Sequence, residues 1–591
     1  MLMTASDFLD LAANAQAQRI VEIRRRSGQP LSDQTAADLS QALQALAHAR
    51  SSGSICANAN TLNTPLAVAH LLSDRIARES DATFDRSHPS VLVIDRDDEC
   101  TRIYDESGFA SELALARRLI RMAQTPATGL APSSNCAQQT EQDKAIDLAC
   151  SKRLAIITGG PGTGKTTTVV RILQALLTQT PDLNIVLAAP TGKAAGRMKQ
   201  AVYARSRGEE NPDIRSRLEQ LQSCTLHRLL TTPAAGAHRP DQEHPLECDV
   251  LVVDESSMID NDLACALFAA IDPERTRVIL LGDRFQLAAV GPGSIYADLC
   301  KKDGALAAHI AELSVSHRFD SNKAIGKLSS YINSGRHRET LALLQNLDEH
   351  PAFDDNRIIW EQSRVTKPSL LTAAARKWAQ TMADTLVAAV RRLSAQITDP
   401  ALREQALTDL AKTYARFGAL AATREGPMSV AAINDAIDAD FVAAGLPAPF
   451  WRQIVVRHND PSLGIYNGDV GIVVPSLSGD APEVYFGDTA RTLRYALLPP
   501  HDMAFAITIH QSQGSEYACV GVFLSPNAFS SINTRELLYT AVTRVKDEWD
   551  LAGPVRGTLT IFATPKAVTH AVLTPTERLS GLAKRLKQQN N

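Results

Sequence analysis

A glycine-rich motif constrains the fold of this chain more than any other feature. It follows the apolar run Leu154–Ile157 and precedes a segment with helical periodicity. In this context, backbone N–H groups wrap phosphates at the start of a helix, a lysine reaches the terminal phosphates and a hydroxyl holds Mg²⁺. The motif predicts an α/β domain that binds a nucleotide, with Lys165 as a catalytic group and Thr166 as a metal ligand. The predicted nucleotide-binding residues are Gly159, Gly160, Pro161, Gly162, Thr163, Gly164, Lys165, Thr166 and Thr167.

Four short apolar runs around this motif predict one parallel sheet. They do not alternate with polar residues, which is typical of strands buried on both faces. A polar cluster follows each run, and ligands of such sheets bind at the carboxyl ends of the strands, so the clusters should meet in one crevice. The runs are Leu154–Ile157, Ile185–Ala189, Val250–Val253 and Val278–Leu281.

Three polar side chains in these clusters are candidates for ATP chemistry. Asp254 and Glu255 follow the third run, and Gln286 follows the fourth. Hydrolysis needs a carboxylate near Mg²⁺ and a group that orients the attacking water. We therefore assign Asp254 to the metal, Glu255 to the water and Gln286 to the γ-phosphate.

The rest of the chain contains segments with helical, strand-rich and polar sequence patterns. Residues 1–125 are mostly helical in pattern, with one possible strand at 91–94, and a Pro/Gly/Ser-rich stretch at 125–136 marks a boundary. Residues 355–420 are also helical in pattern. The polar, basic tail from Glu577 is expected to be a solvated helix end. A second strand-rich part has apolar runs at Ile454–Val456, Val470–Val474, Val484–Phe486, Ala504–Thr508, Val520–Leu524 and Leu559–Phe562. Alternation and turn pairs within 450–500 predict a small β module.

Composition excludes several classes of protein. A length of 591 residues implies several domains. A net charge of −4 excludes a binder that works by bulk positive charge, but not a local basic channel for nucleic acid. The nine cysteines form no metal-binding pair and are expected to be reduced thiols. Without a leader pattern or an 18-residue apolar run, a cytoplasmic location is expected.

Ten motifs in fixed order resemble those of superfamily-one helicases, and within them the RecD-like branch of 5′→3′ motors. The resemblance covers about residues 136–565 and is carried by GGPGTGKTTT, APTGKAAGRM, TLHRLL, VLVVDESSMID, LLGDRFQL, LSVSHRF, TREGP, YNGDVG, TIHQSQGSEY and LYTAVTR. It implies an α/β chain with two RecA-like P-loop motor domains that have parallel sheets. The expected divisions are a helical partner-docking domain (1–125), a first motor domain (126–320) with a short insertion (231–249), and a second motor domain (321–591) with an SH3-like insertion (about 450–500).

The resemblance also implies roles for single residues. Gln142 would read adenine, although a plain surface glutamine is the alternative. Arg318 and Arg544 would reach the γ-phosphate from the second motor domain. For His227 and His510, the alternative to a DNA contact is ordinary packing within the protein. The implied DNA contacts are Thr191, Lys193, His227, His510, Ser512 and Gln513.

The resemblance implies an ATP- and Mg²⁺-dependent DNA helicase in an exodeoxyribonuclease V (RecBCD) type complex. Its partners would be single- and double-stranded DNA and RecB-like and RecC-like subunits, in recombinational repair of DNA ends. The alternatives are a free-standing 5′→3′ helicase, an RNA helicase and a non-motor nucleotide switch. Two positions depart from the pattern: Phe285 stands where aspartate is usual, and Gln511 where lysine is usual.

Overall fold

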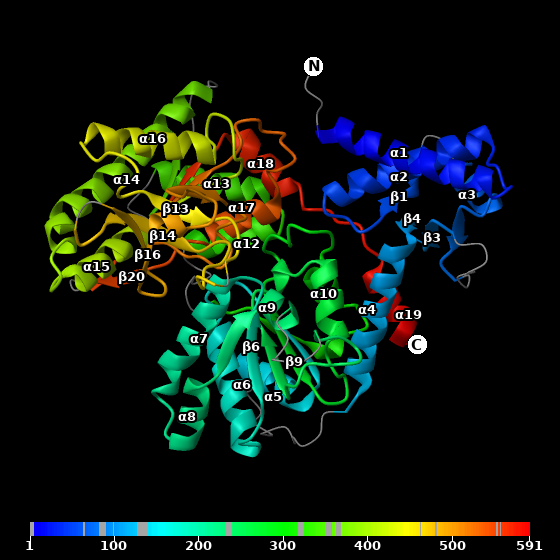
Figure 1. Cartoon of the computed structure of the whole chain (residues 1–591), viewed down its shortest axis with the longest axis horizontal. Coiled ribbons are helices and arrows are strands. Elements are labelled where there is room, and N and C mark those ends of the chain that lie inside the picture. Colours follow the sequence, from blue (N-terminus) through cyan, green and yellow to red (C-terminus); the bar gives the residue numbers. More distant parts are fainter. Residues whose placement is uncertain are drawn as a thin grey trace.

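Two parallel sheets organise the computed structural model (Figure 1). The first motor domain lies at the bottom of this view, the second at the upper left and the N-terminal region at the upper right. The structure describes residues 5–62, 66–81, 90–98, 100–126, 140–231, 239–316, 324–349, 357–361, 368–460, 462–478, 481–550, 553–555 and 557–590. Over these ranges, none of the helices combines the length and apolarity needed to cross a bilayer.

The sheet of the first motor domain has six parallel strands in the order β10-β5-β9-β8-β6-β7. All four predicted runs are confirmed as strands. The two strands that the pattern missed are both edge strands, and β7 is polar in sequence. The strands are β5 (Leu154–Gly159), β6 (Ile185–Ala189), β7 (Gln222–Thr225), β8 (Val250–Val253), β9 (Arg277–Gly282) and β10 (Ile310–Leu313).

Helices cover both faces of this sheet, which explains why its strands read as continuous apolar runs. Ala155 and Ile157 point into one core and Leu154 and Ile156 into the other. The first core is covered by α5 (Glu141–Ser151), α6 (Lys165–Gln179), α7 (Gly192–Ser206) and α8 (Pro212–Glu219). The second is covered by α9 (Leu226–Thr231), α10 (Asn261–Ala269) and α11 (Ile295–Leu299), with short 3₁₀ helices at Ser256–Met258 and Ala307–His309.

The N-terminal region combines helices with a four-stranded sheet of order β1-β4-β3-β2. The possible strand at 91–94 is confirmed as β3, but the other three strands were not predicted, because they are short and carry polar residues. The region contains α1 (Ala5–Arg26), α2 (Asp33–Ser51), β1 (Ala57–Asn58), a 3₁₀ helix (Ala59–Thr61), α3 (Ala67–Ser73), β2 (Ala77–Glu79), β3 (Leu92–Arg96), β4 (Thr101–Asp105) and α4 (Glu106–Gln124).

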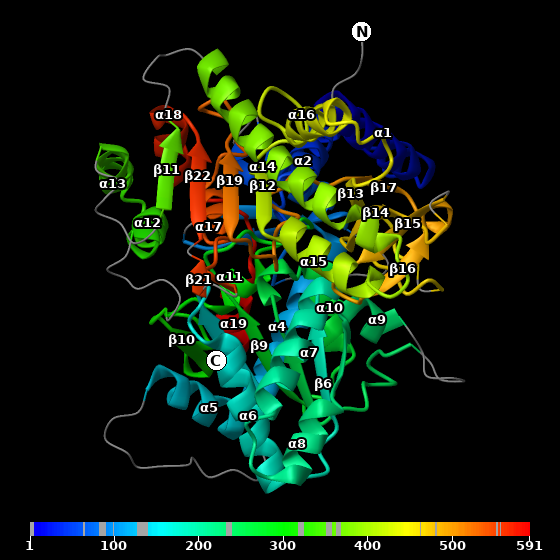
Figure 2. The same cartoon turned by 90° about the vertical axis from the view of Figure 1, so that its left-hand side faces the viewer.

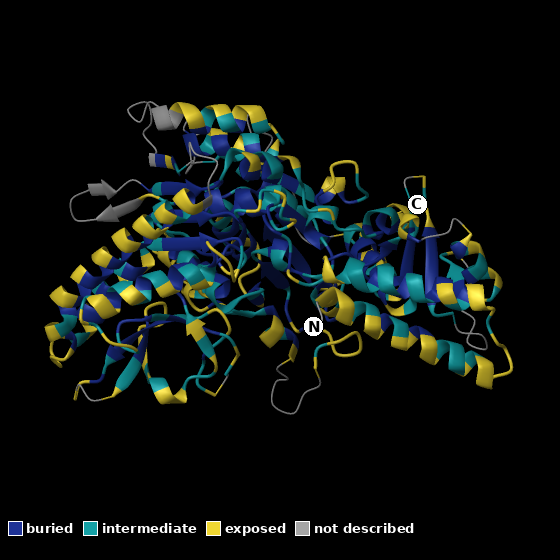
Figure 3. Ribbon diagram, turned by 90° about the horizontal axis from the view of Figure 1, so that it is seen from above, coloured by how far each residue is buried: buried dark blue, intermediate teal, exposed yellow. Residues whose placement is uncertain are grey.

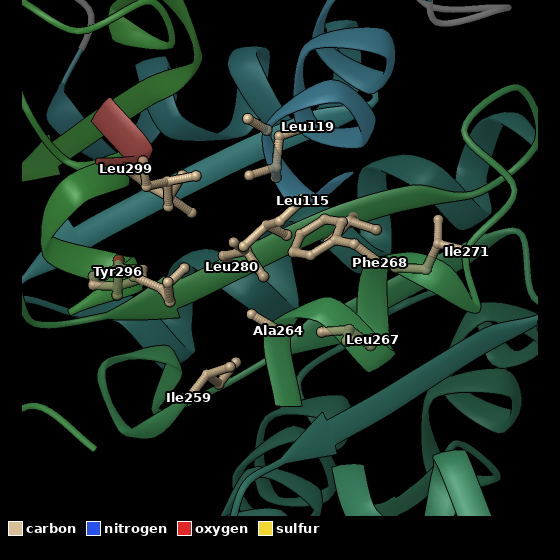
Figure 4. Close-up of a cluster of buried hydrophobic side chains, with 14 of the residues drawn as sticks. Leu115, Leu119, Ile259, Ala264, Leu267, Phe268, Ile271, Leu280, Tyr296 and Leu299 are labelled. Atoms are coloured by element: carbon tan, nitrogen blue, oxygen red, sulfur yellow. The ribbon is translucent and has the colours of Figure 1, made fainter. Parts of the chain in front are cut away.

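Helix α4 joins this region to the first motor domain through one hydrophobic core. Figure 4 shows Leu115 and Leu119 of α4 facing Phe268, Leu280 and Leu299 of the motor domain. Burial on this scale removes each leucine from water, at about 1.5–3 kcal/mol per side chain. The boundary predicted near residue 125 therefore coincides with the end of α4. It does not separate two independent hydrophobic cores.

The sheet of the second motor domain has five parallel strands in the order β11-β22-β19-β12-β18. Figure 2 shows β11, β22, β19 and β12 side by side. The strands are β11 (Arg357–Glu361), β12 (Phe417–Ala421), β18 (Ala506–Thr508), β19 (Cys519–Phe523) and β22 (Thr558–Phe562). The prediction that 355–420 is helical throughout is therefore wrong at both ends, where β11 and β12 lie.

Helices again cover both faces of this sheet. One face carries α12 (Ala324–Asn333), α13 (His337–Glu349), α17 (Arg535–Val542) and α18 (Pro565–Leu573). The other carries α14 (Pro368–Ile397), α15 (Arg403–Ala415) and α16 (Val430–Ala443). A short hairpin is formed by β20 (Glu548–Asp550) and β21 (Gly553–Val555).

The small β module is confirmed as a five-stranded antiparallel sheet of order β16-β15-β14-β13-β17. It has a core of its own around Val456, Val473 and Val484. Figure 3 shows that, across the molecule, buried residues (dark blue) lie mainly inside and exposed residues (yellow) mainly on outer helices and loops. The strands are β13 (Gln453–Val456), β14 (Val470–Pro475), β15 (Pro482–Phe486), β16 (Arg491–Arg494) and β17 (His501–Met503), with a 3₁₀ helix at Tyr495–Leu497.

The C-terminal segment returns to the other side of the molecule. After α18 the chain crosses to α4, where α19 (Leu582–Asn590) packs with Leu582 and Leu586 buried (Figure 1). Arg578 donates to the carbonyls of Gly291 (2.9 Å) and Gly293 (2.8 Å) on the way. The prediction of a solvated tail is wrong, because one face of α19 completes the core shared by α4 and the first motor domain.

Candidate active site

A cavity of about 880 Å³ lies between the two motor sheets. The first motor domain supplies the P-loop and the carboxyl ends of β8 and β9, and the second supplies the loop after β18 and the end of α17. The lining residues are Gln142, Gly160, Pro161, Gly162, Gly164, Lys165, Thr166, Thr167, Ala194, Arg197, Met198, Ala201, Arg205, Asp254, Glu255, Gln286, Gly514, Glu516 and Arg544.

The P-loop is shaped by two left-handed glycines and one hydroxyl. Gly162 and Gly164 have φ values of 76° and 86°, which side-chain-bearing residues rarely adopt. The Thr163 hydroxyl donates to the Gly160 carbonyl at 2.8 Å. The Lys165 ammonium donates to the carbonyls of Gly159 (2.5 Å) and Gly160 (3.1 Å), which holds it inside the loop. The start of α6 and this ammonium together form a site for a polyanion.

Two adjacent carboxyl groups face the P-loop from the end of β8. Burial raises the pKa of Asp254, and burial together with the charge of Asp254 raises that of Glu255. Lys165 lowers both pKa values in opposition. Glu255 has a left-handed φ of 52°, a strained conformation of the kind found at functional sites.

The donor set at the cavity floor suits a hard divalent cation. The Asp254 carboxylate and the Thr166 hydroxyl both line the cavity, and Mg²⁺ prefers oxygen ligands of this kind. Burial is the main cause of the raised pKa of Asp254, and a nearby cation would oppose that rise, as Lys165 and Arg197 already do. The residues present therefore fit a magnesium ion bound with the nucleotide phosphates.

Gln286 has one unsatisfied atom beside the cavity. Its amide nitrogen donates to Asp283 at 3.3 Å, while its buried Oε1 has no hydrogen-bond partner in the protein. Asp283 also accepts from the Tyr539 hydroxyl of the second motor domain at 2.9 Å. The neighbouring Phe285 meets the Tyr539 ring edge-on, with centroids 6.2 Å apart. An apolar contact across the domains thus occupies the position where aspartate is usual.

Arg544 reaches the cavity from the second motor domain. It is only 3% exposed, and its guanidinium donates to the carbonyls of Thr540 (3.0 Å) and Ser515 (3.3 Å). Its charge acts on Glu255 across the domain interface. Close by, the Leu287 amide donates to the Thr540 hydroxyl at 3.0 Å.

Most of the predicted nucleotide residues meet in this cavity. Gln142 lies in the first turn of α5, beside a capping box between Thr140 and Asp143. Arg318 lies outside the described residues. The segment before it is anchored, because Glu141 accepts hydrogen bonds from the amide (2.6 Å) and hydroxyl (2.5 Å) of Ser314. These bonds lower the pKa of Glu141, although its partial burial works the other way.

Four of the six predicted DNA-contact residues are at least partly accessible. Thr191 caps α7 by accepting from the Ala194 amide at 3.2 Å, and Lys193 follows on the first turn. His227 is exposed on α9. His510 is half-buried, and burial together with the charge of Arg578 lowers its pKa. Of the predicted insertion at 231–249, residues 232–238 lie outside the described residues.

The other two predicted contacts are buried residues of the second motor domain. Ser512 is fully buried, and its hydroxyl donates to the Ile509 carbonyl at 2.7 Å. Gln513 is 6% exposed, and its amide donates to the Leu287 carbonyl of the first motor domain at 2.8 Å. Both side chains are engaged inside the protein in this structure, and their contact with DNA stays a prediction.

Sequence reasoning missed two cations of α7 that line the cavity, Arg197 and Arg205. Arg197 of α7 lines it together with Asp254 and Glu255. A helical signal was available, because Arg197 follows Lys193 by four residues, and side chains at this spacing share one helix face. Nothing in the residue pattern placed that face against the second motor domain.

Comparisons with known proteins agree with this geometry. Residues 142–292 match the family model "AAA domain", and residues 503–548 match "UvrD-like helicase C-terminal domain". The chain is 35% identical over 466 residues to the RecBCD enzyme subunit RecD of Mycobacterium tuberculosis, covering 76% of this chain and 73% of that one. It is 32% identical over 497 residues to the RecBCD enzyme subunit RecD of Haemophilus influenzae, covering 76% and 72%.

Solved structures with similarity include Bacteroides Pif1 bound to single-stranded DNA. That similarity has 17% identity, covers 73% of this chain and 93% of that one, and has a TM-score of 0.38. The family assignment rests on the RecD sequences and on the cavity between two parallel sheets. The chain belongs to the RecD family of ATP-dependent DNA helicases, which is part of helicase superfamily one.

Proposed function

We propose that this RecD-family helicase moves 5′→3′ along DNA as a motor subunit of a RecBCD-type helicase–nuclease acting at double-strand ends. One observation carries the proposal: a single cavity joins the P-loop and Asp254–Glu255 of the first motor domain to Arg544 of the second. A nucleotide bound there touches both sheets, so its hydrolysis changes the contact between them. Alternating closure and release is how such a motor advances.

The residues of the cavity take distinct roles in this proposal. Lys165 binds the β- and γ-phosphates, Gln142 contacts adenine and Gln286 senses the γ-phosphate through its free Oε1. Thr166 and Asp254 hold Mg²⁺, which neutralises phosphate charge when bound. Glu255 accepts a hydrogen bond from the attacking water and orients it. Arg544 stabilises charge on the phosphoryl oxygens with a guanidinium that keeps its proton, and Arg318 remains predicted for the same task.

The DNA path runs between the motor domains and the SH3-like module. Thr191 and Lys193 start α7 beside that module, and a Cβ added at Gly192 would lie 3.7 Å from the Cβ of Tyr466. His510 approaches from the second motor domain, and His227 from α9. Contacts of this kind reach mainly phosphate, so binding should depend little on base sequence and weaken steeply with salt.

The N-terminal region is the proposed docking surface for RecB-like and RecC-like subunits. On α1, Phe8, Leu11 and Ile23 are 66%, 58% and 56% exposed. Phe8 and Leu11 lie one turn apart, and exposed apolar side chains on one helix favour a protein partner. A free-standing helicase is the second candidate, and a chain that purifies alone and unwinds DNA at full rate would favour it.

Strand-displacement assays test direction and substrate together. Duplexes with a 5′ or a 3′ single-stranded tail are incubated with ATP and Mg²⁺, using the parent chain and Lys165→Ala. If partner subunits are needed, both chains are assembled with them, and the Lys165→Ala complex gives the background from any other motor. We expect Lys165-dependent unwinding of 5′-tailed DNA only. Unwinding confined to 3′-tailed DNA would reject the direction, and equal unwinding of RNA would reject the substrate class.

A further inference from the structure

Helix α7 places two cations of the first motor domain at two different sites. Lys193, in its first turn, lies near Asp469 of the SH3-like module, where its charge partly offsets the rise in the pKa of Asp469 caused by burial. Arg197, one turn later, lines the nucleotide cavity. One rigid helix therefore spans the distance between the proposed DNA path and the proposed ATP site.

Arg197 also crosses the domain interface. Its guanidinium donates a hydrogen bond to the Gly514 carbonyl, in the loop that follows β18 of the second motor domain. A guanidinium that donates to a carbonyl forms a charge-assisted bond, stronger than a neutral one. The contact joins residues 317 positions apart in the sequence.

The loop that receives this bond is held at three consecutive residues. The Gln513 amide donates to Leu287, the Gly514 carbonyl accepts from Arg197, and the Ser515 carbonyl accepts from Arg544. Two of these three bonds go to the first motor domain. His510, a proposed DNA contact, lies four residues before Gly514 in the same connection between β18 and β19.

Small residues allow this close approach. Ala189, Ala194 and Ala195 form a buried cluster where α7 meets the end of β6. Gly514 has a left-handed φ of 70°, and a Cβ added there would lie 3.9 Å from the Ala194 Cβ and 3.9 Å from a carboxylate oxygen of Glu255. The loop backbone therefore lies directly over the carboxylate proposed to orient water.

We propose that Arg197 is a positioning residue that fixes the 513–515 loop over Glu255 and thereby couples DNA occupancy to ATP hydrolysis. This inference rests on the proposed function, because it takes the cavity as the ATP site and α7 as part of the DNA path. A shift of α7 on binding DNA moves Arg197, and with it the loop beside Glu255. By reciprocity, nucleotide in the cavity changes the affinity for DNA by the same factor as DNA changes the affinity for nucleotide.

The coupling is measured as a ratio of two dissociation constants. Binding of labelled single-stranded DNA to the full chain is titrated with and without a non-hydrolysable ATP analogue in Mg²⁺. In the parent we expect the two constants to differ by a factor within about 5–150, the usual size of coupling between sites. Arg197→Ala should bring the ratio to within about twofold of one, because one charge-assisted bond is worth about tenfold or more. Lys199→Ala removes an exposed cation from the same helix and should keep the parent ratio.

A merely structural role would change both affinities but leave their ratio unchanged. Arg197→Lys keeps the charge and a donor, and should retain part of the coupling. If Arg197→Ala fails to fold, Arg197→Gln replaces it, because it removes the charge and keeps most of the length: a ratio near one supports the inference, and a parent-like ratio overturns it. A parent-like ratio in Arg197→Ala overturns the inference and leaves the proposed function intact. A parent ratio of one also overturns the inference, whereas the strand-displacement assays test the proposed function separately.

Discussion

Replacing Arg585 with alanine should destabilise the joint between the N-terminal region and the first motor domain. Arg585 is 2% exposed, and its guanidinium pairs with Glu112 at 2.7 Å and with Asp95 at 3.3 Å. Its guanidinium carbon also lies 4.4 Å from the centroid of the Phe109 ring and 4.8 Å from that of the Tyr104 ring. Removing one partner of a buried ion pair costs about 3–5 kcal/mol, because the other charge stays buried without compensation.

The lower end of that range fits this site. Glu112 keeps a hydrogen bond from the Tyr104 hydroxyl at 2.9 Å after the change, and the Gly581 amide donates to it at 3.1 Å. We therefore expect a loss of about 3 kcal/mol. The double variant Arg585→Ala with Glu112→Gln should recover part of the loss, since it removes the uncompensated charge.

The loss of stability caused by Arg585→Ala should depend on pH. Burial raises the pKa of Glu112 above its ordinary value of 4.5, and the charge of Arg585 opposes that rise. Without Arg585 the folded-state pKa rises further, so the native state binds more protons than the unfolded state above pH 4.5. Stability of Arg585→Ala relative to the parent should thus fall as the pH rises from about 5 to 8.

The assay must distinguish unfolding of the N-terminal region and the first motor domain from unfolding of the second motor domain. All four tryptophans, at positions 360, 378, 451 and 549, belong to the second motor domain and its β module. Urea unfolding followed by far-UV circular dichroism should show an earlier transition in Arg585→Ala, while the tryptophan transition stays close to that of the parent. Lys587→Ala is the control, because its ion pair with Asp303 is 3.7 Å long and exposed. Equal midpoints for Arg585→Ala and Lys587→Ala, or a loss independent of pH, would refute the reasoning.

Four further predictions concern the cavity and the docking surface. Lys165→Ala should abolish DNA-stimulated phosphate release with an unchanged circular dichroism spectrum; near-normal turnover would contradict the P-loop assignment. Glu255→Gln should still bind a fluorescent ATP analogue but lose about 10²–10⁴ in turnover, the usual contribution of a proton-accepting group, and Arg544→Ala should lose about 10³–10⁵. If Arg544→Ala stayed within about tenfold of the parent, a transition-state role across the domains would be rejected. The double variant Phe8→Ser with Leu11→Ser should lose co-purifying partner subunits while keeping ATPase activity, whereas stoichiometric co-purification would place the interface elsewhere.

The apolar pattern predicted the central strands of both sheets but not all of their edges. Strands such as β8 and β19 are buried on both faces, so their sequences are continuous apolar runs. Polar β7 gives no such signal. Strand β12 follows α15 directly, and its small apolar residues continue the helical pattern.

The sequence predicted those residues of the candidate site that lie at the carboxyl ends of strands. Lys165, Asp254 and Gln286 meet because parallel strands direct their carboxyl ends to one edge. The burial of Ser512 and the reach of Arg197 depend on how the second motor domain packs against the first. Sequence periodicity describes single elements, so contacts between distant elements were outside its scope.

The pairing of Arg585 with Asp95 also sets an order for biogenesis. The two residues are 490 positions apart, and domains generally fold from the N-terminus during synthesis. The fold around α4 must form while Asp95 and Glu112 still lack their counter-ion, and it reaches full stability only when Arg585 emerges from the ribosome. A product of interrupted translation that stops before residue 584 lacks both Lys584 and Arg585, and therefore carries two uncompensated carboxylates at the joint. Such a product is the weaker substrate for assembly and the better one for proteolysis, so this ion pair favours the intact motor over its fragments.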